Sequence, residues 1–191
     1  GFTVSKLESS VNVTVENINV GDTAYINVSA DSRIDNVIID LNGQNPLNLN
    51  NGKGIMPVSN LAYGNYTVIV RFNGNSELLN KTVNFTFNVS KINLSQDAIT
   101  MDNDFKTPEF LINIKNDATG TLTVTINNND HSQSVVNGNA IVEVNDLTPG
   151  IYGAIVTYSG DEKYNSISKE FNFIIKAEPA IIIEVNDILV G

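Results

Sequence analysis

The chain contains an internal repeat of roughly 85 residues, which is within the size range of small sandwich domains. The Asn-Gly pair at residues 51–52 recurs at residues 137–138, and Phe-Asn-Gly-Asn at residues 72–75 aligns with Tyr-Ser-Gly-Asp at residues 158–161. No gap is needed across the second half of the unit. The other recurring positions are Leu61, Gly64, Tyr66, Phe85 and Phe87 in the first copy and Leu147, Gly150, Tyr152, Phe171 and Phe173 in the second.

The two ends of the sequence extend the repeat. Residues 2–6 copy residues 87–91, and residues 185–191 reproduce the pattern of residues 15–21. We therefore predict an excerpt of a longer array, whose parts are listed here in chain order. Residues 1–6 end a preceding repeat, residues 7–91 and 92–177 form two complete repeats, and residues 178–191 provide the first strand of a truncated third repeat.

Hydrophobic residues alternate with polar ones at a period of two, which is typical of strands with one buried face. The inward sets predicted from this alternation are Tyr66, Val68, Val70 and Phe72; Val83, Phe85, Phe87 and Val89; Leu122, Val124 and Ile126; and Tyr152, Ala154, Val156 and Tyr158. No segment of more than about ten residues has the period of an amphipathic helix. The sequence therefore predicts an all-β fold of antiparallel sandwiches.

Turn residues separate the alternating runs. Asn-Gly pairs at residues 42–43, 51–52, 73–74 and 137–138 are expected to supply the positive φ of tight hairpin turns, and Pro149-Gly150 is expected to do the same. Strand-length runs between turns, with no intervening helical pattern, favour a sandwich or barrel over a parallel sheet.

A Leu-x-x-Gly-x-Tyr spacing occurs once in each repeat. Leu61, Gly64 and Tyr66 form it first, and it recurs as Leu147, Gly150 and Tyr152. This spacing resembles the tyrosine corner of immunoglobulin-like domains, in which a Tyr at the start of a strand donates its hydroxyl to nearby backbone. The alternative is that both are ordinary tyrosines at the start of a strand. We predict tandem immunoglobulin-like antiparallel β-sandwiches, with Tyr66 and Tyr152 in structural roles.

The second repeat resembles the immunoglobulin-like repeats of adhesin-like surface proteins, best represented in methanogenic archaea. The resemblance rests on Leu-Thr-Pro-Gly-Ile-Tyr at residues 147–152, Thr-Tyr-Ser-Gly-Asp at residues 157–161 and Tyr-Asn at residues 164–165. The first repeat is a more divergent copy, with Leu78 in place of Tyr164. The resemblance implies an extracellular array on the cell surface that acts as a stalk or display arm, with cell adhesion as an associated role. It supplies no catalytic residues.

Composition limits the classes of partner and chemistry. The net charge of −10 comes from scattered carboxylates, and the 11 basic residues are dispersed, which argues against nucleic-acid binding. The absence of cysteine removes disulfides and thiolate sites. No apolar stretch is long enough for a signal peptide or membrane span, so we expect no membrane contact by this fragment.

The polar residues suggest little chemistry. The single histidine, His131, lies in a polar stretch interpreted as a surface loop, and we expect no enzyme and no cofactor. A structural calcium ion is a further possibility, because oxygen-rich loops supply its ligands. The acidic residues considered for such a site are Asp97, Asp102, Asp104, Asp161 and Glu162.

Two covalent modifications are also considered. Seven Asn residues precede Ser or Thr by two positions, and Asn12, Asn84 and Asn88 are expected on the solvent-facing side of strands, where glycosylation is sterically feasible. The other four are Asn27, Asn65, Asn80 and Asn93. A Lys–Asn cross-link involving Lys81, Lys115 or Lys169 is the second, although an ordinary solvent-facing lysine is the usual case.

Two functions compete. In the first, each repeat is a spacer whose partners are the neighbouring repeats of the same chain. In the second, the loops after the tyrosine-corner strands, at residues 73–77 and 159–164, bind a glycan or protein on a host or partner cell. Tyr158, Asp161 and Tyr164 are the candidate residues of this binding loop. An enzyme would require distant polar residues to converge in a cleft.

Overall fold

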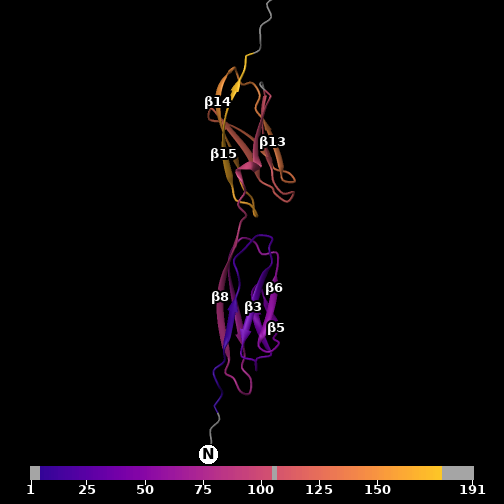
Figure 1. Ribbon diagram of the computed structural model, residues 1–191, viewed down its shortest axis with the longest axis vertical. Helices are drawn as coiled ribbons and strands as arrows, with labels where there is room; N and C mark the ends of the chain where they lie inside the picture. Colours follow the sequence, from indigo (N-terminus) through magenta and orange to yellow (C-terminus); the bar gives the residue numbers. More distant parts are fainter. Residues whose placement is uncertain (1–4, 105–106, 178–191) are drawn as a thin grey trace, which may run out of the picture. The chain divides into compact units, whose positions relative to one another are not determined.

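A computed structural model describes residues 5–104 and 107–177. The described elements are strands, apart from one short 3₁₀ helix, η1 (Gln96–Ala98) (Figure 1). Of the described residues, 5–93 and 162–165 form one compact unit, and 94–104, 107–161 and 166–177 form the other. The all-β prediction is therefore confirmed.

The first unit contains two sheets of different size. The smaller has the order β1-β3-β6, and the larger has the order β2-β8-β7-β4-β5. All pairings are antiparallel except that of β2 with β8. The strands are β1 (Val11–Thr14), β2 (Ile18–Asn19), β3 (Ala24–Ala30), β4 (Asn36–Asp40), β5 (Gln44–Asn48), β6 (Lys53–Val58), β7 (Gly64–Phe72) and β8 (Lys81–Ser90). A three-stranded sheet that faces a second sheet, in which the last two strands β7 and β8 pair next to β4, is the arrangement of an immunoglobulin-like sandwich.

The second unit follows the same plan with one strand fewer. Its sheets have the orders β13-β10-β9 and β12-β11-β14-β15, and all of their pairings are antiparallel. The strands are β9 (Ile99–Asp104), β10 (Thr107–Asn113), β11 (Thr121–Ile126), β12 (Asn129–Ser134), β13 (Asn139–Glu143), β14 (Gly150–Tyr158) and β15 (Ile167–Ile175). A strand equivalent to β2 is missing from the described residues of this unit.

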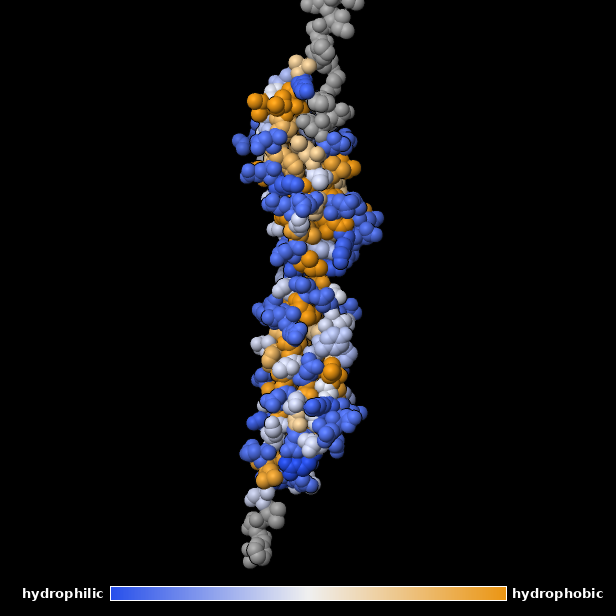
Figure 2. Space-filling model, in the orientation of Figure 1, coloured by the Kyte–Doolittle hydropathy of each residue, from blue (hydrophilic) through white to orange (hydrophobic). Residues whose placement is uncertain are grey.

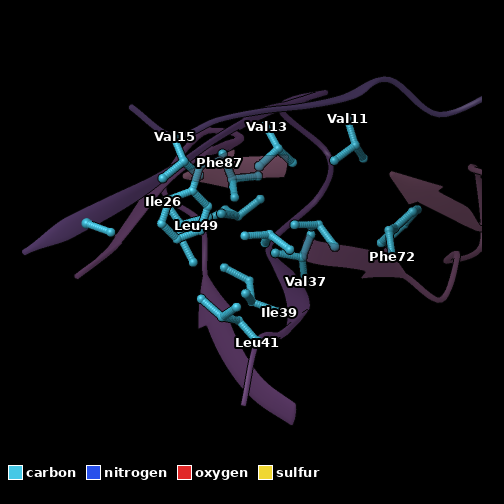
Figure 3. Close-up of a cluster of buried hydrophobic side chains, with 14 of the residues drawn as sticks. Val11, Val13, Val15, Ile26, Val37, Ile39, Leu41, Leu49, Phe72 and Phe87 are labelled. Carbon is cyan, nitrogen blue, oxygen red and sulfur yellow. The ribbon is translucent and has the colours of Figure 1, made fainter. Parts of the chain in front are cut away.

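The core of the first unit lies between its two sheets. Val11 and Val13 of β1 and Ile26 of β3 point toward Ile39 of β4 and Phe87 of β8 (Figure 3). Alternate positions of each strand are buried, so that β3, for example, is buried at Ala24, Ile26 and Val28 and largely exposed between them. At about 25 cal/mol per Å² of buried apolar surface, this layer is the main stabilising contribution. The predicted inner faces are confirmed, although Tyr66, Val83, Phe85 and Tyr152 are only half-buried.

Tight turns form at two of the predicted Asn-Gly pairs. Both central residues have positive φ at Asn51-Gly52 (49° and 76°) and at Asn137-Gly138 (50° and 76°), as a type I′ hairpin turn requires. Asn127-Asn128 (50° and 63°) forms a third such turn, between β11 and β12, at a pair that lacks the glycine typical of hairpin turns.

Two turn predictions were wrong. Asn73-Gly74 does not form a tight hairpin turn, because only Gly74 has positive φ and the loop from β7 to β8 spans residues 73–80. Asn75 organises that loop by accepting hydrogen bonds at its Oδ1 from the N–H groups of Glu77 and Leu78 (2.9 and 2.8 Å). Gly150 has no positive φ either and begins β14, whereas Asp146 (65°) supplies the left-handed residue before it.

The visible surface of each unit is mostly polar, with apolar residues scattered over it (Figure 2). The described part of the chain contains no helix with the length and hydropathy of a membrane span.

Candidate functional site

The two tyrosines of the Leu-x-x-Gly-x-Tyr spacing make equivalent contacts. The hydroxyl of Tyr66 donates to the carbonyl of Ala62 (2.9 Å), and that of Tyr152 donates to the carbonyl of Thr148 (2.8 Å). Each ring also stacks on a phenylalanine of the neighbouring strand, with centroids 5.5 Å apart for Tyr66–Phe87 and 5.7 Å for Tyr152–Phe173. Both tyrosines therefore tie the entry of a strand to the backbone four residues earlier.

The remaining members of that spacing differ between the copies. Leu61 is buried, whereas Leu147 is half-buried. Gly64 has a φ of 147°, whereas Gly150 has no positive φ. The two copies therefore share the tyrosine contacts, but they differ in the burial of the leucine and in the backbone conformation of the glycine.

The predicted binding loop needs correction at both of its aromatic residues. Tyr158 is 0% exposed and Tyr164 is 2% exposed, so neither ring face is available to a ligand. The hydroxyl of Tyr158 donates to the carbonyl of Thr119 (2.7 Å), which satisfies it inside the unit. The polar residues around these rings had suggested an exposed loop, but its first part contacts residues 119–121 instead.

Asp161 also contacts Thr119. Its Oδ2 accepts from the N–H of Thr119 (2.8 Å) and from the Thr119 hydroxyl (3.3 Å). Ser159 reinforces the docking, because its N–H donates to the carbonyl of Thr121 and its Oγ accepts from the N–H of Thr121. These residues bind the loop to the sandwich.

The acidic residues considered for calcium are spread over three parts of the second repeat. Asp97 is in η1, where it accepts from the Ser95 hydroxyl (3.1 Å); Asp102 is in β9 opposite Glu109; and Asp161 contacts Thr119. Asp104 is the last residue of β9. Glu162 is the first residue of the segment 162–165, which belongs to the first compact unit. Within residues 5–104 and 107–177, no group of three or more His, Cys, Asp or Glu side chains is arranged to hold a metal ion. A structural calcium ion stays a prediction that melts with and without a chelator would test.

The three preferred glycosylation residues have different surroundings. Asn12 and Asn84 are exposed, and neither side-chain amide has a hydrogen-bond partner in the described structure. Asn88 is half-buried, which corrects its expected exposure. Its Nδ2 donates to Asn65 Oδ1 (2.9 Å), and its Oδ1 accepts from the Ser90 hydroxyl (2.6 Å). A glycan on Asn88 would have to disturb this network, whereas Asn12 and Asn84 are accessible.

Two further residues differ from their sequence interpretation. His131 does not lie in a loop: it is part of strand β12, opposite Val124, and half-buried. Lys169 is not an ordinary solvent-facing lysine, because its Nζ donates to the carbonyls of Ile99 (2.7 Å) and Gln96 (3.1 Å). Lys169 therefore joins the last strand of the second unit to the beginning of that unit.

An ion pair holds together one end of the first unit. Arg33 donates through Nε and Nη2 to the two carboxylate oxygens of Asp31 (2.9 and 2.8 Å) and through Nη1 to Glu77 (3.3 Å). The side-chain hydrogen bonds from Arg33, followed by its backbone N–H, lower the pKa of Asp31 to about 2. The same carboxylates raise the pKa of Arg33.

One exposed aromatic residue lies outside every predicted site. Tyr25 is 56% exposed on the outer face of β3, and Ile55 of β6 is 60% exposed nearby. The alternation of β3 indicates an outward position for Tyr25, but a single exposed tyrosine carries no signal of function in the sequence.

Searches of known proteins gave structural matches but no sequence match. No protein-family model matches the chain, and no curated protein matches it. The chain is similar to Bacteroides uniformis β-glucuronidase 3 (TM-score 0.38, 12% identity), covering 85% of this chain and 24% of that one. The chain thus spans about a quarter of that enzyme.

Two smaller structures are covered almost completely. The D0-D1 domain of intimin has a TM-score of 0.32 and 12% identity, with coverage of 86% of this chain and 97% of that one. Fibronectin(III)-like modules of Clostridium thermocellum CbhA have a TM-score of 0.33 and 10% identity, with coverage of 92% and 100%.

Proposed function

We propose that this chain is a non-catalytic stalk segment of an extracellular, adhesin-like cell-surface protein, in which successive immunoglobulin-like units act as spacers. The observation that carries the proposal is the recurrence of the same local contacts at 86-residue intervals, as in the hydroxyl bonds of Tyr66 and Tyr152. Units that repeat their internal structure and neighbour one another in sequence are suited to extension by addition. On the family resemblance, archaeal surface arrays are the proposed setting.

The first residue of each repeat supports a spacer role through its backbone hydrogen bonds. The N–H of Leu7 donates to the carbonyl of Glu77 (2.8 Å), and the N–H of Leu79 donates back to Leu7 (2.9 Å). Ile92 makes the same pair of bonds with Lys163 and Asn165 (2.8 and 2.9 Å). Backbone held on both sides has less conformational freedom than a Gly/Ser-rich linker, and a spacer benefits from that restriction.

The alternative of a glycan- or protein-binding loop after the tyrosine-corner strand has less support in the second unit. Burial of Tyr158 and Tyr164, together with the Asp161–Thr119 contacts, uses the three candidate residues internally. The proposed partners of the chain are therefore the neighbouring repeats, and contact with another cell would belong to other parts of the array.

Single-molecule force spectroscopy tests the spacer proposal. Pulling the chain between its ends should give two separate unfolding events, each releasing a contour length of about 85 residues at roughly 3.5 Å per residue. Each event corresponds to one independently folded unit. A single event that releases the whole chain, or a featureless extension without a force peak, would contradict the proposal.

Surface location needs a separate measurement on the source cells. Antibodies raised against this chain should label intact cells, and a protease added outside should remove the label. Labelling that requires permeabilised cells would place the protein inside and would exclude the proposed stalk.

A further inference from the structure

The outer face of the sheet β1-β3-β6 contains a groove that the proposed stalk role does not use. It has a volume of about 350 Å³ and is lined mainly by Asn12, Thr14, Asn27, Ser29, Lys53 and Ile55. A second hollow of about 250 Å³ on the same face is lined by Glu16, Thr23, Tyr25 and Asn27, among others. Because Asn27 lines both, the two hollows are neighbours along β3.

Register places the polar groups of this groove in pairs. Asn12 lies opposite Ser29 and Thr14 lies opposite Asn27, so that each amide faces a hydroxyl across β1 and β3. The Nδ2 of Asn27 donates to the carbonyl of Tyr25 (3.1 Å), so Asn27 presents its Oδ1 as an acceptor, whereas the Asn12 amide and the two hydroxyls can both donate and accept. Such a surface matches a ligand that carries several hydroxyl groups along its length.

Apolar side chains run beside this polar row. Tyr25 lies opposite Pro57, and Asn27 lies opposite Ile55, so Tyr25 and Ile55 are diagonal neighbours across β3 and β6. Both are more than half exposed. Sugar rings are amphipathic in the same way, with C–H groups that pack on an aromatic ring and hydroxyls at the rim.

The charges of the groove favour an uncharged ligand. Glu16 lies in one hollow and Lys53 in the other, so the two charges balance, and the net charge of −10 on the chain repels anions. From Tyr25 to Ser29 the strand covers about 14 Å, enough for several linked rings. We propose that this face of the first unit binds a short neutral oligosaccharide.

The second unit provides an internal comparison. At the positions of Glu16, Tyr25 and Pro57 it has Asp102, Glu109 and Glu143, which lie side by side in β9, β10 and β13. Three adjacent carboxylates offer no apolar surface for a sugar ring. The proposal therefore concerns the first unit alone, and it does not depend on the stalk role.

NMR titration tests the proposal. The full chain, labelled with ¹⁵N and made in a host without N-glycosylation, is titrated to millimolar concentration with neutral trisaccharides: β-1,4-linked glucose, α-1,4-linked glucose and α-linked mannose. At least one should shift the amide signals of Tyr25, Asn27 and Ile55. Tyr25→Ala should lower the affinity about tenfold or more, because the largest apolar contact is lost.

Two variants control for general effects. Tyr63→Ala removes a tyrosine that is 50% exposed outside the groove, and Ile141→Ala changes the equivalent of Ile55 in the second unit; neither should alter binding. A well-dispersed spectrum without shifts for any trisaccharide would overturn the proposal. So would shifts that persist unchanged in Tyr25→Ala or that lie on the second unit.

Discussion

The two units have the same core arrangement, but the connection after the first strand differs in length and in the sheet that it joins. In the first unit Val13 pairs with Val28, fifteen positions later, whereas in the second Ile99 pairs with Ile112, thirteen positions later. The longer connection lets the chain leave β3 after Thr14 and pair with β8 as the parallel strand β2. The shorter one keeps β9 alongside β10 up to Asp104. A length difference of two residues therefore determines whether the chain after the first strand pairs with the other sheet or stays in the same sheet.

The side chains near that strand differ accordingly. In the first unit Asn17 Oδ1 accepts from the N–H of Asn88 (2.7 Å), and Asn88 contacts Asn65. At the positions of Asn65 and Asn88 the second unit has Ile151 and Ile174, which pair with each other and are 82% and 54% exposed. Features that both units share should therefore have equal energetic effects, and features of one unit should affect that unit alone.

The largest shared effect is expected at the hairpin glycines. Gly52 and Gly138 both have φ of 76°, and an added Cβ would overlap the carbonyl of Ala30 or of Lys115. Gly52→Ala and Gly138→Ala should each destabilise its own unit by about 2–3 kcal/mol. Hydrogen–deuterium exchange of strand amides, followed by mass spectrometry, reports the two units separately.

Gly43→Ala is the matched control for these variants, because Gly43 also has positive φ (127°) but no atom lies within 4 Å of its added Cβ. Its cost should be smaller. If only one of the two hairpin variants destabilised its unit, the equivalence of the turns would be lost.

The next pair of equivalent residues, Tyr158 and Phe72, differs by one hydroxyl group. Tyr158 in the second unit is replaced by Phe72 in the first, and both rings are buried. Tyr158→Phe should destabilise the second unit by about 1–2 kcal/mol, because the carbonyl of Thr119 loses its hydroxyl donor. Thermal melts combined with the same exchange measurement would detect it.

Phe72→Tyr is the reciprocal test. The substitution would add a polar hydroxyl to a buried site that is built around the Phe72 ring, so it should not stabilise the first unit. Stabilisation by Phe72→Tyr, or no effect of Tyr158→Phe, would show that the hydroxyl is not what distinguishes the two sites.

Alternation was sufficient to predict the strands whose two faces differ in polarity. Val68 and Val70 in β7 are buried as expected, and so are Leu122 and Val124 in β11. Strand β12 was missed because residues 129–134 are all polar or charged. It is an edge strand whose backbone bonds to β11 and whose two faces are largely exposed, so no hydrophobic period marks it.

The candidate site was harder to predict because burial of a loop depends on what packs against it. Tyr158, Asp161 and Tyr164 lie among Ser, Gly and Lys, which is typical of an exposed loop. Tyr158 and Asp161 contact Thr119, about 40 positions earlier, and Tyr164 forms a backbone bridge with Ile92, about 70 positions earlier. Sequence spacing contains no signal for such pairs. For Tyr25, the alternation of β3 predicts that the side chain points outward, but the sequence does not show which residues of β1 and β6 lie beside it.

The parallel strand β2 should make the first unit mechanically stronger. Force applied to the chain before β2 and after β8 pulls these parallel strands past each other, so their hydrogen bonds must break together. Asn17→Ala removes the acceptor of the Asn88 N–H and should cost about 1 kcal/mol. In force spectroscopy this variant should lower the higher of the two unfolding forces and leave the lower one unchanged.

Asn19→Ala is a control on the same strand, because its side chain makes no hydrogen bond in the described structure while its backbone pairing with Ser90 is kept. Unchanged forces are expected for it. If Asn17→Ala altered the lower force instead, the first unit would not be the stronger one.

The smallest effect concerns the acid response of the first unit. Hydrogen bonds from Arg33 lower the pKa of Asp31 from 3.8 to about 2 in the folded protein. A carboxyl with a lowered folded pKa stabilises the protein above its unfolded pKa, and this contribution is lost as the pH falls through the folded value. The first unit should therefore lose a small part of its stability between about pH 4 and pH 2.

Asp31→Asn isolates this contribution, because the amide cannot ionise and forms no ion pair with Arg33. The stability difference between wild type and Asp31→Asn should be constant above about pH 5 and should shrink toward pH 2, as measured by chemical denaturation at each pH. Asp22→Asn, which changes a carboxylate that does not contact Arg33, should leave that pH dependence intact. High salt should weaken the effect, since Arg33 is exposed and Asp31 is partly exposed to solvent. A wild-type-minus-variant difference that grew toward low pH would mean that the ion pair destabilises the folded unit, and Arg33 would then have to be assigned to the contact with Glu77 instead.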